Sequence, residues 1–156
     1  RLGGMDQRVS LVTLGVADMD RARDFYTALG WQPGPSPEHI QFFQAGGLVV
    51  ALWDRMALAV DSGIDIDDED EDTPGSGDGW GGKVLGLNVA SSGDVDEQFA
   101  VAVDAGAEVL RPPATRYWGG YSGVFADPDG HVWEVAYNPY WTVTDDGRTL
   151  LGDGRG

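Results

Sequence analysis

Cysteine is absent from this 156-residue sequence, and so is any apolar run of membrane-spanning length. Without cysteine the chain forms no disulfide, thiolate metal site or iron–sulfur cluster, and it has no thiol nucleophile. A membrane-spanning helix needs about 20 consecutive apolar residues, and the N-terminus lacks the charged and then apolar layout of a secretion signal. We therefore expect a cytoplasmic protein without a membrane partner.

Basic residues are also scarce, with 10 lysines and arginines against 26 acidic residues and a formal net charge of -16. A surface of this sign repels phosphate backbones, which excludes nucleic acid as a partner. By contrast, 42% of the residues are hydrophobic and 10% are aromatic. That content supplies a hydrophobic core, and the length suits one domain or two small repeated halves.

Much of the negative charge lies in one stretch, residues 61–72, which reads DSGIDIDDEDED. Like charges at this density repel one another, and glycine and proline follow them, so the pattern predicts an acidic, glycine-rich linker over 61–81 that is mobile over 65–79. Weak binding of a divalent cation is the alternative. The stretch lacks the glycine and terminal glutamate spacing of a calcium-binding helix-loop-helix, which favours a linker.

The half before the linker, residues 5–60, opens with a strand-like run over 9–16 that is rich in β-branched residues. A helix follows, with Asp18 or Asp20 as its N-cap and Gly30 as its stop. Its buried face is set by apolar residues at helical spacing, which are Ala22, Phe25, Tyr26 and Leu29. The remaining segments predict strands over 39–44 and 48–53 and a short helix over 55–60.

The half after the linker, residues 82–139, repeats this order. A strand over 84–90 precedes a helix that we expect Asp94 to cap and Gly106 to end. Three further strands are predicted, at 108–110, 121–126 and 131–137, with an Asp-Pro-Asp-Gly turn before the last one.

Each half thus reads as one strand, one helix and about three strands, which predicts an α+β fold. Two such βαβββ modules bury their open faces by pairing into a curved, incomplete barrel around a cleft. Residues 140–156 remain as a C-terminal extension. Its apolar residues are expected to dock on the body or on a second subunit, and they are Tyr140, Trp141, Leu150 and Leu151.

Three runs carry a resemblance to a known family: VTLGVADMDRARDFYTALGW at 12–31, AGAEVLRPP at 105–113 and WGGYSGVFADPDGHVWEVAYNP at 118–139. They resemble the vicinal oxygen chelate superfamily, which includes glyoxalase I, extradiol dioxygenases, and the bleomycin and fosfomycin resistance proteins. The resemblance implies this fold for nearly the whole chain. It does not imply one function, because the fold carries many chemistries. A homodimer is common in the family.

The resemblance also implies where a divalent metal ion would bind, since the family's enzymes hold it with the first and last strands of each half. The matching positions are Leu11, Ala51, Val84 and Glu134. Three of these side chains have no lone pair, so we expect a metal-free cleft. Neither histidine supplies the missing ligands, because His131 points away from Glu134 on a strand and His39 lies in a Pro-Gly-rich approach to one.

Glu134 has two readings that the sequence leaves open. In the first it is a structural carboxylate paired with a neighbouring hydroxyl or guanidinium, such as Tyr121 or Arg116. In the second it is catalytic, as a general base, or it anchors a ligand.

Six tryptophans is a high count for this length, and several aromatic residues are expected near the cleft: Trp53, Trp80, Tyr117, Trp118, Tyr121 and Trp133. Trp53 and Trp118 are predicted to form walls that stack on a flat or cationic ligand, and the negative charge of the protein favours a cation. The predicted ligand contacts are Phe43, Trp53, Arg116, Trp118 and Tyr121.

These features favour a binding protein of the resistance type, with no cofactor and an aromatic or cationic small molecule as its ligand. The alternatives are a metal-dependent lyase, isomerase or dioxygenase similar to glyoxalase I, with one divalent metal ion, and metal-independent acid–base catalysis by Glu134.

Overall fold

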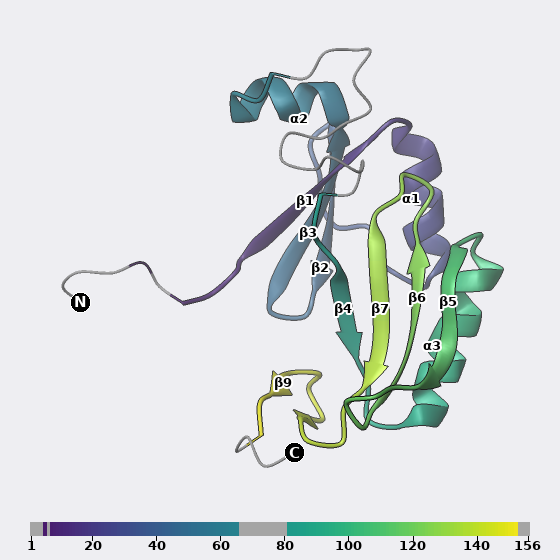
Figure 1. The fold of residues 1–156 in the computed structure, drawn as a ribbon. Coiled ribbons are helices and arrows are strands. Elements are labelled where there is room, and N and C mark those ends of the chain that lie inside the picture. The colour runs from purple at the N-terminus through teal and green to yellow at the C-terminus, as the bar shows by residue number, and fades with distance from the viewer. Residues whose placement is uncertain (1–4, 6, 66–80, 153–156) are drawn as a thin grey trace.

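A computed structural model describes residue 5, residues 7–65 and residues 81–152 (Figure 1). Most of the predicted linker and Trp80 lie outside the described residues. The elements are β1 (Leu11–Val16), α1 (Met19–Ala28), β2 (Ile40–Ala45), β3 (Leu48–Asp54), α2 (Arg55–Ser62), β4 (Leu85–Asn88), α3 (Ser92–Asp104), β5 (Glu108–Thr115), β6 (Tyr121–Ala126), β7 (Val132–Tyr137), β8 (Thr142–Val143) and β9 (Thr149–Leu150). Among the helices of this described part, none is long and apolar enough to cross a membrane.

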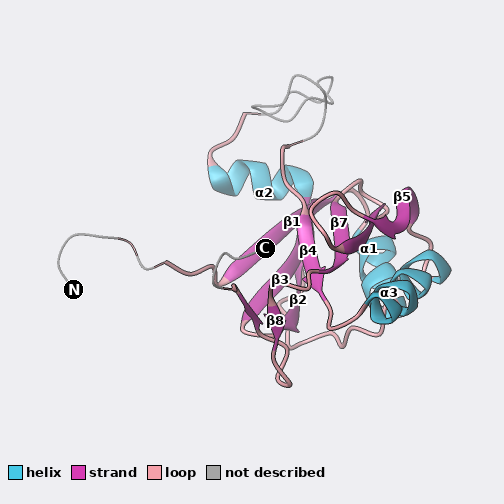
Figure 2. Ribbon diagram, turned by 60° about the horizontal axis from the view of Figure 1, so that its bottom comes forward, coloured by secondary structure: helices cyan, strands magenta, loops and turns pink. Residues whose placement is uncertain are grey.

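The strands form two main sheets, and both stay open over the described residues. Sheet A has the order β1-β3-β2 and sheet B has the order β4-β7-β6-β5. In each sheet the first strand pairs in parallel with the last strand of its half, and the other pairings are antiparallel. Figures 1 and 2 place α1 and α3 on the same side of the sheets. The predicted α+β fold with two similar modules is therefore confirmed.

The first module departs from the prediction in its strand count. After α1 it has two strands, and the third is reduced to a single bridge between Pro33 and Phe43. The segment 32–37 reads QPGPSP, and proline has no N–H for a strand ladder, so this edge cannot extend.

The helix ends follow the local sequence closely. Asp18 caps α1 by accepting a hydrogen bond from the Arg21 N–H at 3.0 Å. Ser91, and not the predicted Asp94, caps α3, because Ser91 is the last extended residue and its hydroxyl accepts from the Asp94 N–H at 3.1 Å. Gly30 and Gly106 follow their helices with φ of 97° and 101°, a conformation that glycine adopts without strain. The stops at these two glycines are confirmed.

Strand β5 is longer than the predicted 108–110 and continues through Pro112 and Pro113 to Thr115. Proline is tolerated there because β5 is an edge strand, where an N–H is not required on the open side. The register with β6 shifts on either side of Arg111, so β5 is irregular at this point.

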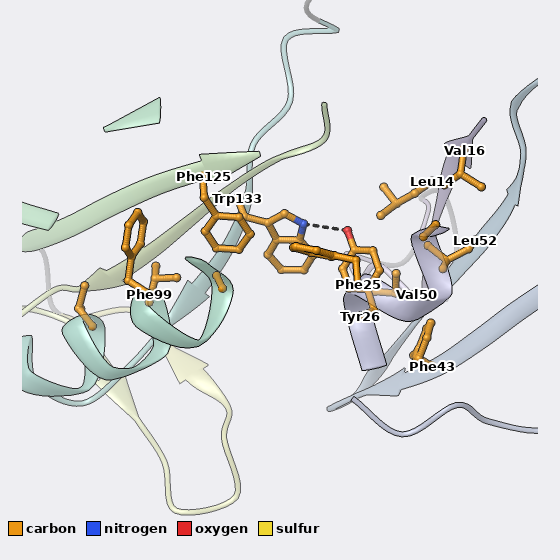
Figure 3. Packing of buried hydrophobic residues seen from close by; sticks show 14 residues of the cluster. Leu14, Val16, Phe25, Tyr26, Phe43, Val50, Leu52, Phe99, Phe125 and Trp133 are labelled. Atoms are coloured by element: carbon orange, nitrogen blue, oxygen red, sulfur yellow. Dashed lines mark hydrogen bonds between the residues drawn. The ribbon is translucent and has the colours of Figure 1, made fainter. Parts of the chain in front are cut away.

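Tyr26 lies at the centre of the core, with none of its surface exposed (Figure 3). Its ring contacts Phe25, Trp31, Phe43 and Trp133 at centroid distances of 5.1, 5.2, 6.1 and 6.3 Å. Trp133 lies on β7 of sheet B, whereas Tyr26 lies on α1 of the first module. The two modules therefore share one aromatic core.

A buried polar chain crosses the same boundary. The Tyr26 hydroxyl donates to Asp127 Oδ2 at 2.6 Å and accepts from Trp133 Nε1 at 3.2 Å. The other Asp127 oxygen, Oδ1, accepts from the N–H groups of Asp129 and His131, both at 2.9 Å. Burial, reinforced by the Asp127 charge, raises the pKa of Tyr26 far above its usual range, so the hydroxyl remains a donor.

The Asp-Pro-Asp-Gly turn also holds the start of α1. Asp129 Oδ1 accepts from the Ala17 N–H and from the Arg21 guanidinium, both at 2.9 Å. His131 Nε2 lies 2.8 Å from the Gly15 carbonyl oxygen. The sequence predicts only a strand connection here, whereas in the structure this turn joins the two modules.

The C-terminal extension folds into the small β8–β9 hairpin. Tyr140 lies against Gly119, where an added Cβ would stand 3.1 Å from the Tyr140 hydroxyl. All four apolar residues of the extension stay exposed, with Tyr140 at 46%, Trp141 at 40%, Leu150 at 44% and Leu151 at 77%. The extension therefore contacts the body through Tyr140 but buries none of these side chains on it.

We predict that Tyr26→Phe lowers the free energy of unfolding by about 1–3 kcal/mol, because it leaves the buried Asp127 Oδ2 and Trp133 Nε1 without a partner. Urea denaturation measures this loss. Tyr121→Phe is the matched control, since its hydroxyl donates to Asp96 at the same 2.6 Å but at the surface. Equal losses for the two variants would contradict a central role for the Tyr26 hydroxyl.

Candidate functional site

The candidate site lies on the face of sheet B that is turned away from α3. Side chains alternate along β6 and β7, and the helix-facing set includes Phe125, whose ring lies 6.0 Å from that of Phe99 on α3. The opposite set contains Ser122 and Glu134. Strand pairing places Ser122 beside Ala136 and Val124 beside Glu134, so the polar groups share one face.

Glu134 is engaged by two neighbours on this face. Its Oε2 accepts from the Ser122 hydroxyl at 2.9 Å and lies 3.4 Å from Arg111 Nη2. The predicted pairing with a hydroxyl and a guanidinium is thus of the correct chemical kind, but the predicted partners, Tyr121 and Arg116, are wrong. The register of β5 on β6 brings Arg111 and Ser122 to this carboxylate instead.

Ser122 also holds the Arg111 guanidinium in place. Its Nη1 donates to the Ser122 carbonyl oxygen at 2.8 Å and its Nη2 donates to the Ser122 hydroxyl at 2.9 Å. Burial, followed by the positive charge of Arg116, lowers the pKa of Arg111, and the charge of Glu134 opposes this shift in part. The guanidinium is therefore oriented by the protein and has a second cation nearby.

The turn between β5 and β6 adds an aromatic wall. The Arg116 N–H donates to the Gly120 carbonyl oxygen at 2.8 Å, which continues the ladder and places Arg116 on the face of Gly120 and Ser122. A Cβ added to Gly120 would collide with the Trp118 ring and approach the Tyr137 carbonyl oxygen at 2.5 Å. Glycine at position 120 therefore leaves the space beside its Cα that the Trp118 ring occupies.

The other predicted ligand contacts lie elsewhere. Trp53 is the residue before the last one of β3, next to α2, and Trp118 belongs to the connection between β5 and β6. Figure 1 shows α2 at the top and the β5–β6 connection at the bottom. The two tryptophans therefore do not form facing walls. Tyr121 points to the helix side and donates to Asp96 on α3, and Trp133 belongs to the core. Tyr117 is 94% exposed.

A pocket of about 430 Å³ lies on sheet A, away from Glu134. Its lining is mostly apolar and comes from Ser10, Leu11, Gly34, Pro35, Phe42, Phe43, Gln44 and Val49. Phe43, a predicted ligand contact, is thus part of its wall. The residue is only 1% exposed and its ring packs on Tyr26 and Trp31, so the ring itself belongs to the core and is closed to a ligand.

The four positions that match the family's metal ligands do not fit a metal ion. Leu11 and Val84 are half exposed, Ala51 is buried, and none of the three side chains carries a donor atom. Glu134 already shares its Oε2 with Ser122 and Arg111, and a guanidinium charge beside it repels a cation. Within residues 7–65 and 81–152, no three His, Cys, Asp or Glu side chains form a cluster that would hold one.

Sequence reasoning missed Arg111 and Ser122. Arg111 precedes two prolines, which read as a strand break, and Ser122 lies in a strand whose alternation gives no reason to single it out. One feature of the sequence does point to such residues: a carboxylate that faces a cleft, as Glu134 is predicted to do, needs hydrogen-bond partners from neighbouring strands.

Known proteins resemble the chain over most of its length. A solved structure of a glyoxalase-related enzyme from Fulvimarina pelagi matches with a TM-score of 0.80 and 35% identity, over 94% of this chain and 99% of that one. An uncharacterized protein of Mycobacterium bovis is 30% identical over 129 residues, which is 78% of each chain. A lactoylglutathione lyase from Agrobacterium tumefaciens shares the fold, with a TM-score of 0.60 and 21% identity over 85% of this chain and 95% of that one.

A family model agrees with the structural similarity. The model of the Glyoxalase/Bleomycin resistance protein/Dioxygenase superfamily matches residues 8–135, which cover most of both modules and the Asp-Pro-Asp-Gly turn. With its two similar modules and open sheets, the chain belongs to this superfamily.

Proposed function

We propose that this protein binds a small organic molecule without a metal ion, as a binding protein of the resistance type. The observation that carries the proposal is that Glu134 is already engaged by neighbouring side chains. It is the one oxygen donor among the four positions that match the family's metal ligands, and it is hydrogen-bonded to Ser122 and paired with Arg111.

The groups around Glu134 suit binding of an organic ligand. A binding site needs apolar surface and a few fixed polar groups that set orientation. Trp118 supplies an aromatic ring beside Gly120, and Arg111 supplies an oriented guanidinium. The apolar pocket on sheet A, which includes Leu11 and Val49, offers a further surface for hydrocarbon.

A metal-dependent lyase, isomerase or dioxygenase finds less support. A catalytic metal ion needs about three protein ligands and an open position for substrate, and here apolar side chains occupy three of the four positions. Acid–base catalysis by Glu134 would require the carboxylate to exchange its bond with Ser122 for one with substrate. The cytoplasmic location and the homodimer stay predictions.

We predict that Trp118→Ala weakens binding of a naphthalene carboxamide probe about tenfold, because the probe loses its stacking surface. Isothermal titration calorimetry measures the dissociation constant. Trp53→Ala is the matched control and should leave it unchanged, since Trp53 lies at the other end of the sheets. The reverse pattern would favour the sequence-based wall at Trp53 and reject the site described above.

Gly120→Ala gives an independent variant for the same site. Its Cβ would displace the Trp118 ring without removing it, so binding should weaken while the tryptophan count stays the same. The far-ultraviolet circular dichroism spectrum checks that the fold is kept. Unchanged binding in a folded Gly120→Ala protein would contradict a ligand position against this ring.

For the metal, we predict that protein purified without chelator holds less than stoichiometric nickel, zinc, manganese or iron, because Leu11, Ala51 and Val84 offer no ligand atom. Elemental analysis measures the content. Glu134→Gln is the informative companion variant. A stoichiometric metal in the unmodified protein that disappears in Glu134→Gln would overturn the proposed metal-free site.

A further inference from the structure

Two arginines meet on one face of sheet B, although the chain has only 10 basic residues against 26 acidic ones. Arg111 lies on β5 and Arg116 lies in the turn that follows it. The carboxylate of Glu134 is the acidic group that pairs with this cluster. The three side chains therefore carry two positive formal charges and one negative charge.

The pairing of Arg111 with Glu134 is weak enough for Arg111 to bind a further anion. Its Nη2 lies 3.4 Å from Glu134 Oε2, whereas a tight charge-assisted hydrogen bond between nitrogen and oxygen measures about 2.7–2.9 Å. The contact is also single, without the second parallel bond of a bidentate pair. The shorter bonds of Arg111 go to Ser122, which is neutral, so its positive charge is compensated only in part.

Arg116 has no carboxylate within ion-pair distance among the described residues. The ladder bond from its N–H to the Gly120 carbonyl oxygen sets it on the face that also carries Ser122. Its charge acts on Arg111 strongly enough to contribute to the lowered pKa of that group. Two guanidinium groups whose charges act on one another repel, and an anion that contacts both would remove this cost.

We propose that the ligand carries an anionic oxygen group, a carboxylate or a phosphate, that binds to Arg111 and Arg116 while its aromatic part lies on Trp118. Arginine suits this task because its planar N–H groups match the oxygens of such anions. The inference rests on the proposed function and adds the charge of the ligand. It reverses the preference for a cation that the net charge of -16 suggests.

The long-range field of the protein does not oppose this binding strongly. At physiological ionic strength, charges separated by more than about 8 Å are largely screened. The groups that touch the ligand therefore decide its sign.

The test uses three probes of one shape: a naphthalene carboxylate, the matching carboxamide and a naphthyl phosphate. We expect the carboxylate or the phosphate to bind more tightly than the neutral carboxamide, and salt to weaken the anion only. Arg116→Gln should raise the dissociation constant of the anion about tenfold and leave that of the carboxamide unchanged. Calorimetric titration gives all these values, and the tighter anion identifies the group that is recognised.

Arg148→Gln is the control, because Arg148 lies between β8 and β9, is 70% exposed and pairs with Asp146. It should change neither affinity. Equal binding of anion and carboxamide, with no effect of Arg116→Gln in a folded protein, overturns the anionic ligand but leaves the proposed function standing. Failure of all three probes to bind contradicts both.

Discussion

The hydrogen bond from the Tyr26 hydroxyl to Asp127 is the interaction on which the arrangement of the two modules depends. The carboxylate is buried, and a buried charge is costly unless its oxygens find hydrogen-bond donors. Its own turn supplies two N–H donors, but the third donor comes from α1 of the other module. Trp133 then donates to the same hydroxyl. Both carboxylate oxygens have a donor only when the modules are together, so this contact specifies how they pair.

The polar residues of the Asp-Pro-Asp-Gly turn are used in contacts between the two modules. Asp129 is occupied by the Ala17 N–H and Arg21, and His131 by the Gly15 carbonyl group. A histidine and two aspartates close together would otherwise suggest a metal or a catalytic group. Here they hold the end of β1 and the start of α1. The sheet faces are left to make the contacts with a ligand.

The fold was predictable to a larger extent than the site. Helix caps, glycine stops and strand alternation are local signals, and they place α1, α3, β6 and β7 within a few residues. The site depends on register. Arg111 reaches Glu134 only because β5 continues through two prolines and shifts its pairing on β6, and no local pattern encodes that shift. The separation of Trp53 and Trp118 also follows from the topology, since Trp53 lies at the end of β3 next to α2 and Trp118 lies in the connection between β5 and β6.

The two modules share their arrangement of strands and helix but differ in the side chains on their open sheet faces. In sheet A the positions that match the metal ligands are Leu11 and Ala51, and the nearby pocket is apolar. In sheet B the equivalent face keeps Glu134 but surrounds it with Ser122 and Arg111. A divalent cation would need negative charge from both modules at once, whereas an organic ligand can use hydrocarbon contacts on one and polar contacts on the other. Under the proposed function, the apolar side chains at the matching positions of the first module favour an organic ligand over a cation while the fold stays the same.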